Sequence, residues 1–166
     1  DILVVGSGPS GIASALSAAK NGASVILAED KARFGESLLT DNVTIGNKNG
    51  DEWVEDSISE LKSMPNVIVK KRSQVFGYYD HNMLVMFERC KDHLNEPKPY
   101  TPRQRLWYIR AKHVVISTGS IERPLIFANN DRPGIMLAAS AREYLKVYGV
   151  LPGKNPIIFT NNDTAY

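Results

Sequence analysis

Three glycines and one glutamate near the start of the chain have the types and the spacing of a dinucleotide-binding site. Gly6, Gly8 and Gly11 form a G-x-G-x-x-G pattern directly after the apolar run ILVV and directly before a predicted helix. In this context the first glycine permits a tight turn, the second lets a pyrophosphate approach the backbone, and the third lets helix and strand pack closely. The helix N-terminus adds free N–H groups and the positive end of a dipole, so the pattern predicts a phosphate-binding turn.

Glu29 supplies the second part of this predicted site. It lies 18 residues after Gly11, at the end of the second predicted strand, where a carboxylate accepts hydrogen bonds from ribose hydroxyls. Asp30 and Lys31 follow it and are expected to contact or shape the same pocket. A ribose-binding Glu29 disfavours a 2′-phosphate, whereas Lys31 and Arg33 leave that preference open. NAD and FAD share this fingerprint, so the local chemistry does not separate them.

Strand-like and helical patterns alternate along the first 70 residues, which is typical of a parallel α/β sheet. Residues 2–5 and 24–30 predict buried strands with a helix between them. Strand, helix and strand in this order form a right-handed parallel unit. A polar loop over 31–50 and a helix over 51–63 then precede a third parallel strand in NVIVKK.

The pattern changes between about 74 and 112, where three strand-like runs predict an antiparallel β excursion. The run HVVIST then returns to the central sheet and continues into Thr118 and Gly119. A residue without a side chain at this point lets the backbone approach whatever lies on the glycine turn. Loops and a helix over about 137–148 follow.

The chain is therefore expected to contain one nucleotide-binding domain and part of another. Residues 1–119 form a Rossmann-like domain with its antiparallel excursion, and residues 120–166 form connecting loops and the start of a second, incomplete α/β domain. Ile157–Phe159 predict a buried strand, but Asn161 and Asn162 stand where glycines would be needed. Their side chains would crowd a pyrophosphate, so the second unit is not expected to bind a dinucleotide in this way.

The composition limits the classes of function. The chain has 166 residues, 43% of them hydrophobic, and a formal net charge of +2, which gives no electrostatic reason to expect a nucleic acid or an anionic membrane as partner. The apolar runs are far shorter than the roughly 20 residues of a membrane span. The chain opens without Met and shows no signal peptide, so we expect the native N-terminus upstream. Cys90 is the only cysteine, which suits a reducing, cytoplasmic compartment.

Other reactive residues favour structural roles. His81, Cys90 and His93 match no compact zinc spacing, so no metal is expected. Cys90 also lacks the nearby cysteine that dithiol chemistry requires. Basic and aromatic residues alternate over 103–112, and because neighbouring strand residues point to opposite faces, we expect a solvated face and a packed aromatic there.

Longer stretches of the chain resemble a known family. VFGYYDHN, RQRLWYIRAKHVVISTGSIERPLIFANNDRPGIMLA and YGVLPGKNPIIFTNNDTAY cover most of residues 74–166. They resemble the alpha subunits of heterotetrameric sarcosine oxidases, within the flavoprotein superfamily that has two dinucleotide domains and includes the disulfide reductases. The glycine turn and EDKARFGESLL resemble the same subunits less distinctively.

This resemblance implies that the segment carries NAD, while FAD is held by the beta subunit, FMN lies at the alpha–beta interface, and a folate-binding part of alpha lies outside this chain. It implies an enzyme that oxidatively demethylates sarcosine to glycine, with peroxide and a one-carbon unit passed to tetrahydrofolate, and partners that are the beta and smaller subunits. No catalytic residue is expected in the segment. The turn and the resemblance together give these cofactor-binding residues: Gly6, Gly8, Pro9, Ser10, Gly11, Glu29, Asp30, Lys31, Ser37, Val75, Thr118 and Gly119.

Two alternatives stay open. The segment fits an FAD-binding subunit of a related amine or opine dehydrogenase-like flavoprotein, in which the glycine turn would hold a working flavin. It also fits a non-catalytic assembly scaffold that keeps the fold with an empty site.

Overall fold

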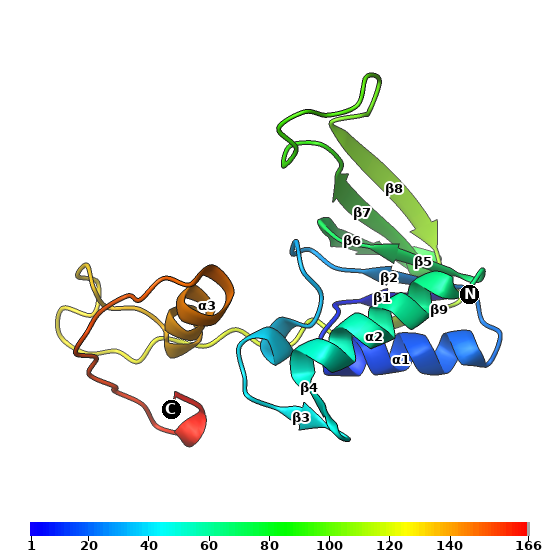
Figure 1. Ribbon diagram of the computed structural model, residues 1–166. Helices are drawn as coiled ribbons and strands as arrows, with labels where there is room; N and C mark the ends of the chain where they lie inside the picture. Colours follow the sequence, from blue (N-terminus) through cyan, green and yellow to red (C-terminus); the bar gives the residue numbers. More distant parts are fainter. Residues whose placement is uncertain (166) are drawn as a thin grey trace. The chain divides into compact units, whose positions relative to one another are not determined.

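Four parallel strands form the central sheet of the computed structural model, which describes residues 1–165. The order of the strands is β5 (Val67–Lys70), β2 (Val25–Ala28), β1 (Ile2–Val5) and β9 (His113–Ile116). β1 lies inside the sheet because Ile2 pairs with Val25 on one side and with His113 on the other. Figure 1 shows this arrangement, which confirms the predicted parallel α/β fold.

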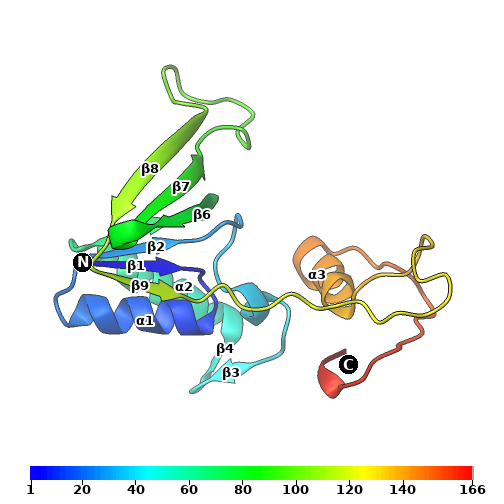
Figure 2. The ribbon, with the colours of Figure 1, turned by 180° about the vertical axis from the view of Figure 1, so that it is seen from behind.

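Two helices cover one face of the parallel sheet, as Figure 2 shows from behind. They are α1 (Pro9–Lys20) and α2 (Gly50–Ser63). Small residues of α1 let this helix lie close to β1. On this face of the sheet, the burial of each large aliphatic side chain stabilises the fold by roughly 1.5–3 kcal/mol. The core on this face consists of Val4, Ile12, Ala15, Ala19, Val25, Leu27, Leu38, Val54, Ile58 and Leu61.

A three-stranded antiparallel sheet packs on the opposite face. Its strands are β6 (Ser73–Tyr79), β7 (Met83–Arg89) and β8 (Gln104–Arg110), in that order. A short 3₁₀ turn at Asp80–Asn82 joins the first two. The predicted antiparallel excursion is confirmed. The core on this side consists of Leu3, Ala28, Leu84, Met86, Ile109 and Ala111.

Glu88 links the two sheets through three side-chain donors. Its carboxylate accepts from Lys70 Nζ at 3.0 Å, from Arg105 Nη1 at 3.1 Å and from Trp107 Nε1 at 2.7 Å. Burial opposes ionisation of this carboxyl, but the hydrogen bonds from Lys70 and Trp107 and the charges of Lys70 and Arg105 outweigh it and lower the pKa of Glu88. Because Lys70 ends β5 and Glu88 lies on β7, the ion pair fastens the antiparallel sheet to the parallel one. As expected for this strand, Trp107 is partly buried while Tyr108 is exposed.

Residues 31–50 contain more structure than the predicted loop. A 3₁₀ helix covers Glu36–Leu39, and β3 (Thr44–Ile45) pairs with β4 (Lys48–Asn49) in a small hairpin. Gly46 adopts a φ of +62° in the hairpin turn. Strands of two residues carry too little periodicity to be recognised in a sequence.

The chain divides into two units, one made of residues 1–38 with 42–119 and the other of residues 39–41 with the chain from Ser120 onward. The second unit contains α3 (Ala138–Tyr148), which ends at Gly149 with a φ of +66°, and a 3₁₀ turn at Asp163–Ala165.

The strand predicted at Ile157–Phe159 is wrong, because these residues have no regular secondary structure and are exposed. A parallel strand requires a neighbour to pair with, and none of the described residues beyond Gly119 forms one.

Candidate dinucleotide site

The glycine turn connects β1 to α1 and is held against the end of β9. Gly6 adopts a φ of +97°, and a Cβ added to it would lie 2.2 Å from the carbonyl oxygen of Ser117. A Cβ added to Gly11 would lie 2.1 Å from the carbonyl oxygen of Gly6. Both distances are impossible for real atoms, so the packing of the protein itself requires glycine at these two positions.

Gly8 differs from the other two glycines. It is the N-cap residue of α1, with an ordinary φ of −64°. The nearest atom to an added Cβ would be Glu36 Cβ at 3.8 Å, which is a normal contact. Neither backbone conformation nor packing requires glycine here, and the space next to Gly8 lies at the N-terminus of a helix, where an anion is favoured.

Glu29 lies beside this turn, with its side chain buried. The residue is 2% exposed, and its Oε2 accepts from the Ser7 N–H at 3.0 Å and from Ser7 Oγ at 2.5 Å. Its Oε1 accepts from the N–H of Lys31 at 2.8 Å. These hydrogen bonds satisfy the buried carboxylate. They connect the end of β2 to the glycine turn through contacts within the protein itself.

The residues after Glu29 take separate places. The carboxylate of Asp30 pairs with Arg89 Nη2 at 2.9 Å, on the side of β7. The ammonium group of Lys31 pairs with Glu36 Oε2 at 3.2 Å. Ser37 follows Glu36 in the 3₁₀ helix and is exposed. Lys31 therefore contacts Glu29 through its backbone N–H and Glu36 through its ammonium group, whereas the carboxylate of Asp30 pairs with a residue of the antiparallel sheet.

Four of the remaining predicted residues lie at or near the turn, and Val75 does not. Pro9 and Ser10 form the exposed first turn of α1. The Cα of Thr118 would lie 3.3 Å from a Cβ on Gly6, and Gly119 has a φ of +68° with open space around it. Val75 packs with the apolar cluster between the two sheets, so its contacts are those of a core residue.

Two residues next to the turn were not among the predicted site residues. Ser7 is fully buried and donates to Glu29, and Glu36 adopts a φ of +48°. The pKa of Glu36 is raised by burial and by the charge of Glu29, against the opposing charge of Lys31. Ser7 could not be predicted because the G-x-G pattern allows any residue at its second position. Glu36 could not be predicted because no sequence pattern indicates a glutamate with a left-handed backbone.

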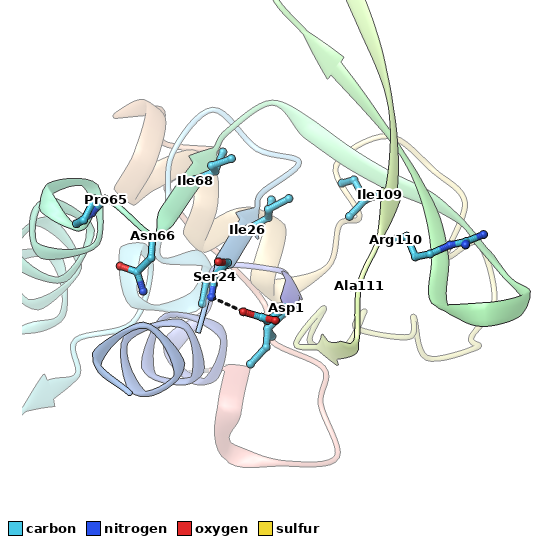
Figure 3. Close-up of a pocket in the computed structure, with 11 residues that line it drawn as sticks. Asp1, Ser24, Ile26, Pro65, Asn66, Ile68, Ile109, Arg110 and Ala111 are labelled. Atoms are coloured by element: carbon cyan, nitrogen blue, oxygen red, sulfur yellow. Dashed lines mark hydrogen bonds between the residues drawn. The ribbon is translucent and has the colours of Figure 1, made fainter. Parts of the chain in front are cut away.

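A hollow of about 270 Å³ lies at the other end of the sheet (Figure 3). Asp1, Ser24 and Asn66 contribute to its wall near the amino ends of the parallel strands, and Asp1 accepts from the Ser24 N–H at 3.0 Å. Ligands of open α/β sheets bind at the carboxyl ends of the strands. The hollow is therefore separate from the glycine turn.

The residues that the structure describes contain no group of three or more His, Cys, Asp or Glu side chains arranged to hold a metal ion. None of the described helices is both long and apolar enough to cross a membrane.

Known proteins resemble this chain over its whole length. Residues 1–71 match the family model for FAD dependent oxidoreductases. The chain is 48% identical over all its residues to the sarcosine oxidase subunit alpha of Rhizobium meliloti and 42% identical to that of Corynebacterium sp. strain P-1. It spans 17% of the length of each of these relatives.

A solved structure has a similar fold. The L-proline dehydrogenase from P. horikoshii superimposes with a TM-score of 0.72 and 26% identity, over 92% of this chain and 29% of that one. The long, high-identity matches and the shared fold lead to one conclusion: the chain belongs to the family of sarcosine oxidase alpha subunits, of which it represents one segment.

Proposed function

We propose that residues 1–119 bind NAD through the glycine turn, as part of the alpha subunit of a sarcosine oxidase. The observation that carries this proposal is the position of Gly8, which caps α1 and has room for a Cβ that the protein does not fill. Packing requires glycine at Gly6 and Gly11, whereas a Cβ at Gly8 would meet nothing closer than Glu36 Cβ at 3.8 Å. Glycine at this position suits an N-cap and also the close approach of a pyrophosphate to the backbone.

The residues around the turn fit the two ends of an adenosine diphosphate group. The pyrophosphate would lie at Gly8 and the first turn of α1, where Ser10 is exposed and Pro9 removes no hydrogen bond that the helix needs. The ribose would lie at Glu29, with Lys31 and the loop at Ser37 forming its edge. A bound nicotinamide dinucleotide supplies hydride-transfer chemistry to an oxidoreductase; the residues of this segment bind and orient it, and we assign none of them a catalytic role.

The activity proposed for the whole protein is supported by the names of its relatives. We propose oxidative demethylation of sarcosine to glycine, with peroxide and a one-carbon unit that passes to tetrahydrofolate. FAD, FMN, folate and the other subunits would bind outside this segment. The similarity to an L-proline dehydrogenase supports this substrate class, because L-proline and sarcosine are both amino acids with a secondary amine.

FAD is the second candidate ligand for the same turn. The match of residues 1–71 to FAD dependent oxidoreductases favours it. The contacts that Gly8 and Glu29 would make are common to both dinucleotides, because each contains adenosine diphosphate.

The identity of the bound nucleotide tests the proposal directly. The full-length alpha subunit should be purified without its partner subunits and denatured, and the released nucleotide identified by chromatography and absorbance. We expect NAD and a colourless protein. A yellow protein that releases FAD would support the second candidate, and a protein that releases nothing and binds neither in calorimetric titrations would indicate a scaffold.

A further inference from the structure

Glu36 has a backbone conformation that glutamate rarely adopts. Its φ of +48° lies in the left-handed region, where a Cβ is disfavoured. The preceding residue fastens this loop to the glycine turn, because the Gly35 N–H donates to the Ser7 carbonyl oxygen at 3.0 Å. The Cβ of Glu36 is also the nearest atom, at 3.8 Å, to a Cβ added at Gly8. The fold therefore holds a carboxyl group at the edge of the proposed nucleotide site.

The charges around Glu36 come from two neighbours. Glu29, at the end of β2, repels it, and Lys31, in the loop that follows, pairs with it at 3.2 Å. Lys31 is the cation that follows Glu29 in the chain, with its backbone N–H on Glu29 Oε1 at 2.8 Å, and it would attract a phosphate on the ribose. Its ion pair with Glu36 offsets that attraction, and the carboxylate of Glu36 adds a repulsion of its own.

We propose that Glu36 is a specificity-determining residue that selects dinucleotides with a free 2′-hydroxyl and rejects those with a 2′-phosphate. This inference rests on the proposed function, because it requires the adenosine ribose to lie at Glu29. Glu29 contributes hydrogen-bond acceptors, while Glu36 neutralises Lys31. Like charges that face each other across an interface are a common means of rejecting a wrong ligand.

The test is a set of NAD and NADP titrations by calorimetry on the full-length alpha subunit. Glu36→Gln removes the charge but keeps a carbonyl oxygen that accepts a hydrogen bond. We expect it to strengthen NADP binding at least about tenfold more than NAD binding, because any relief of repulsion at the pyrophosphate is common to both ligands. The double variant Lys31→Gln with Glu36→Gln should lose this gain, because the gain depends on the positive charge of Lys31.

Two further variants make the result decisive. Glu60→Gln is the matched control, since Glu60 is an exposed α2 residue paired with Lys20 at 2.8 Å, and it should bind both ligands like wild type. Glu36→Gly removes the carboxyl and suits the left-handed backbone, so it should show the same change in selectivity if Glu36→Gln does not fold. An unchanged ratio of NADP to NAD affinity in these Glu36 variants would overturn the inference. A wild-type protein that binds no NAD would refute the proposed function itself, and this inference with it.

Discussion

Alanine substitutions at Gly8 and Gly11 should separate ligand binding from folding. In Gly11→Ala the new Cβ would lie 2.1 Å from the Gly6 carbonyl oxygen. The turn and helix must then move apart by about 1 Å, and overpacking of this kind costs about 1–3 kcal/mol of unfolding free energy. In Gly8→Ala the new Cβ meets nothing closer than 3.8 Å. The loss of a good N-cap residue and the stiffer unfolded chain have opposite signs, so stability should change by less than about 1 kcal/mol.

Gly8→Ala should have a large effect on NAD binding, in contrast to its small effect on stability. The Cβ of Gly8→Ala would stand between the backbone and a pyrophosphate. The loss of one charge-assisted hydrogen bond, about 1.5–3 kcal/mol, corresponds to roughly ten- to hundredfold weaker NAD binding.

Urea unfolding and calorimetric NAD titration of the full-length subunit measure the two effects. Gly153→Ala is the matched control, because its Cβ meets no atom within 4 Å and it lies outside the nucleotide-binding unit. If Gly8→Ala binds NAD like the control, or unfolds as easily as Gly11→Ala, Gly8 does not have the role proposed for it.

Three further outcomes are expected. Glu29→Ala should weaken NAD binding roughly ten- to hundredfold and NADP binding less. It should also lower the thermal midpoint of unfolding, because Ser7 and Lys31 lose their hydrogen-bond acceptor. Equal losses of affinity for both ligands would mean that Glu29 only supports the fold. Because the pKa of Glu88 is lowered in the folded protein, wild type should exceed Glu88→Gln in unfolding free energy at neutral pH. This gap should shrink as the pH falls from about 4.5, the ordinary glutamate value, through the lower folded pKa; urea titrations that show a constant gap down to about pH 3 would contradict it. Gly149→Ala should destabilise the end of α3 by about 1–2 kcal/mol, seen as faster amide exchange there, and unchanged exchange would argue against the left-handed cap.

The central sheet could be predicted because its strands are short apolar runs bounded by turns. The run before Gly6 and the run before Glu29 are buried on both faces, and this leaves a clear pattern in the sequence. Ile157–Phe159 have the same pattern but no neighbouring strand in the described part of their unit. An apolar run in the sequence indicates that a segment tends to be buried. Whether that segment forms a strand depends on a neighbouring strand, which the rest of the domain must supply.

The candidate site was predicted in part for a similar reason. The glycines and Glu29 have fixed spacing, and the structure brings them together at one end of the sheet. Their roles in binding stay predictions. The position of Glu36 at the site could not be predicted, because a left-handed φ is normally indicated by Gly or Asn. Here the loop holds a glutamate in that conformation.

The position of β1 has a consequence for the protein during its synthesis. The edge of β1 that faces β9 stays unpaired until β9 is made, since residue 2 pairs with residue 113. At a translation rate of about 5–20 residues per second, this takes roughly 5–20 s. Throughout that time the nascent chain on the ribosome presents an apolar strand edge, which can pair with neighbouring nascent chains on the same messenger. A strand that is paired on both sides in the finished sheet is therefore exposed to misassembly while the chain is being made.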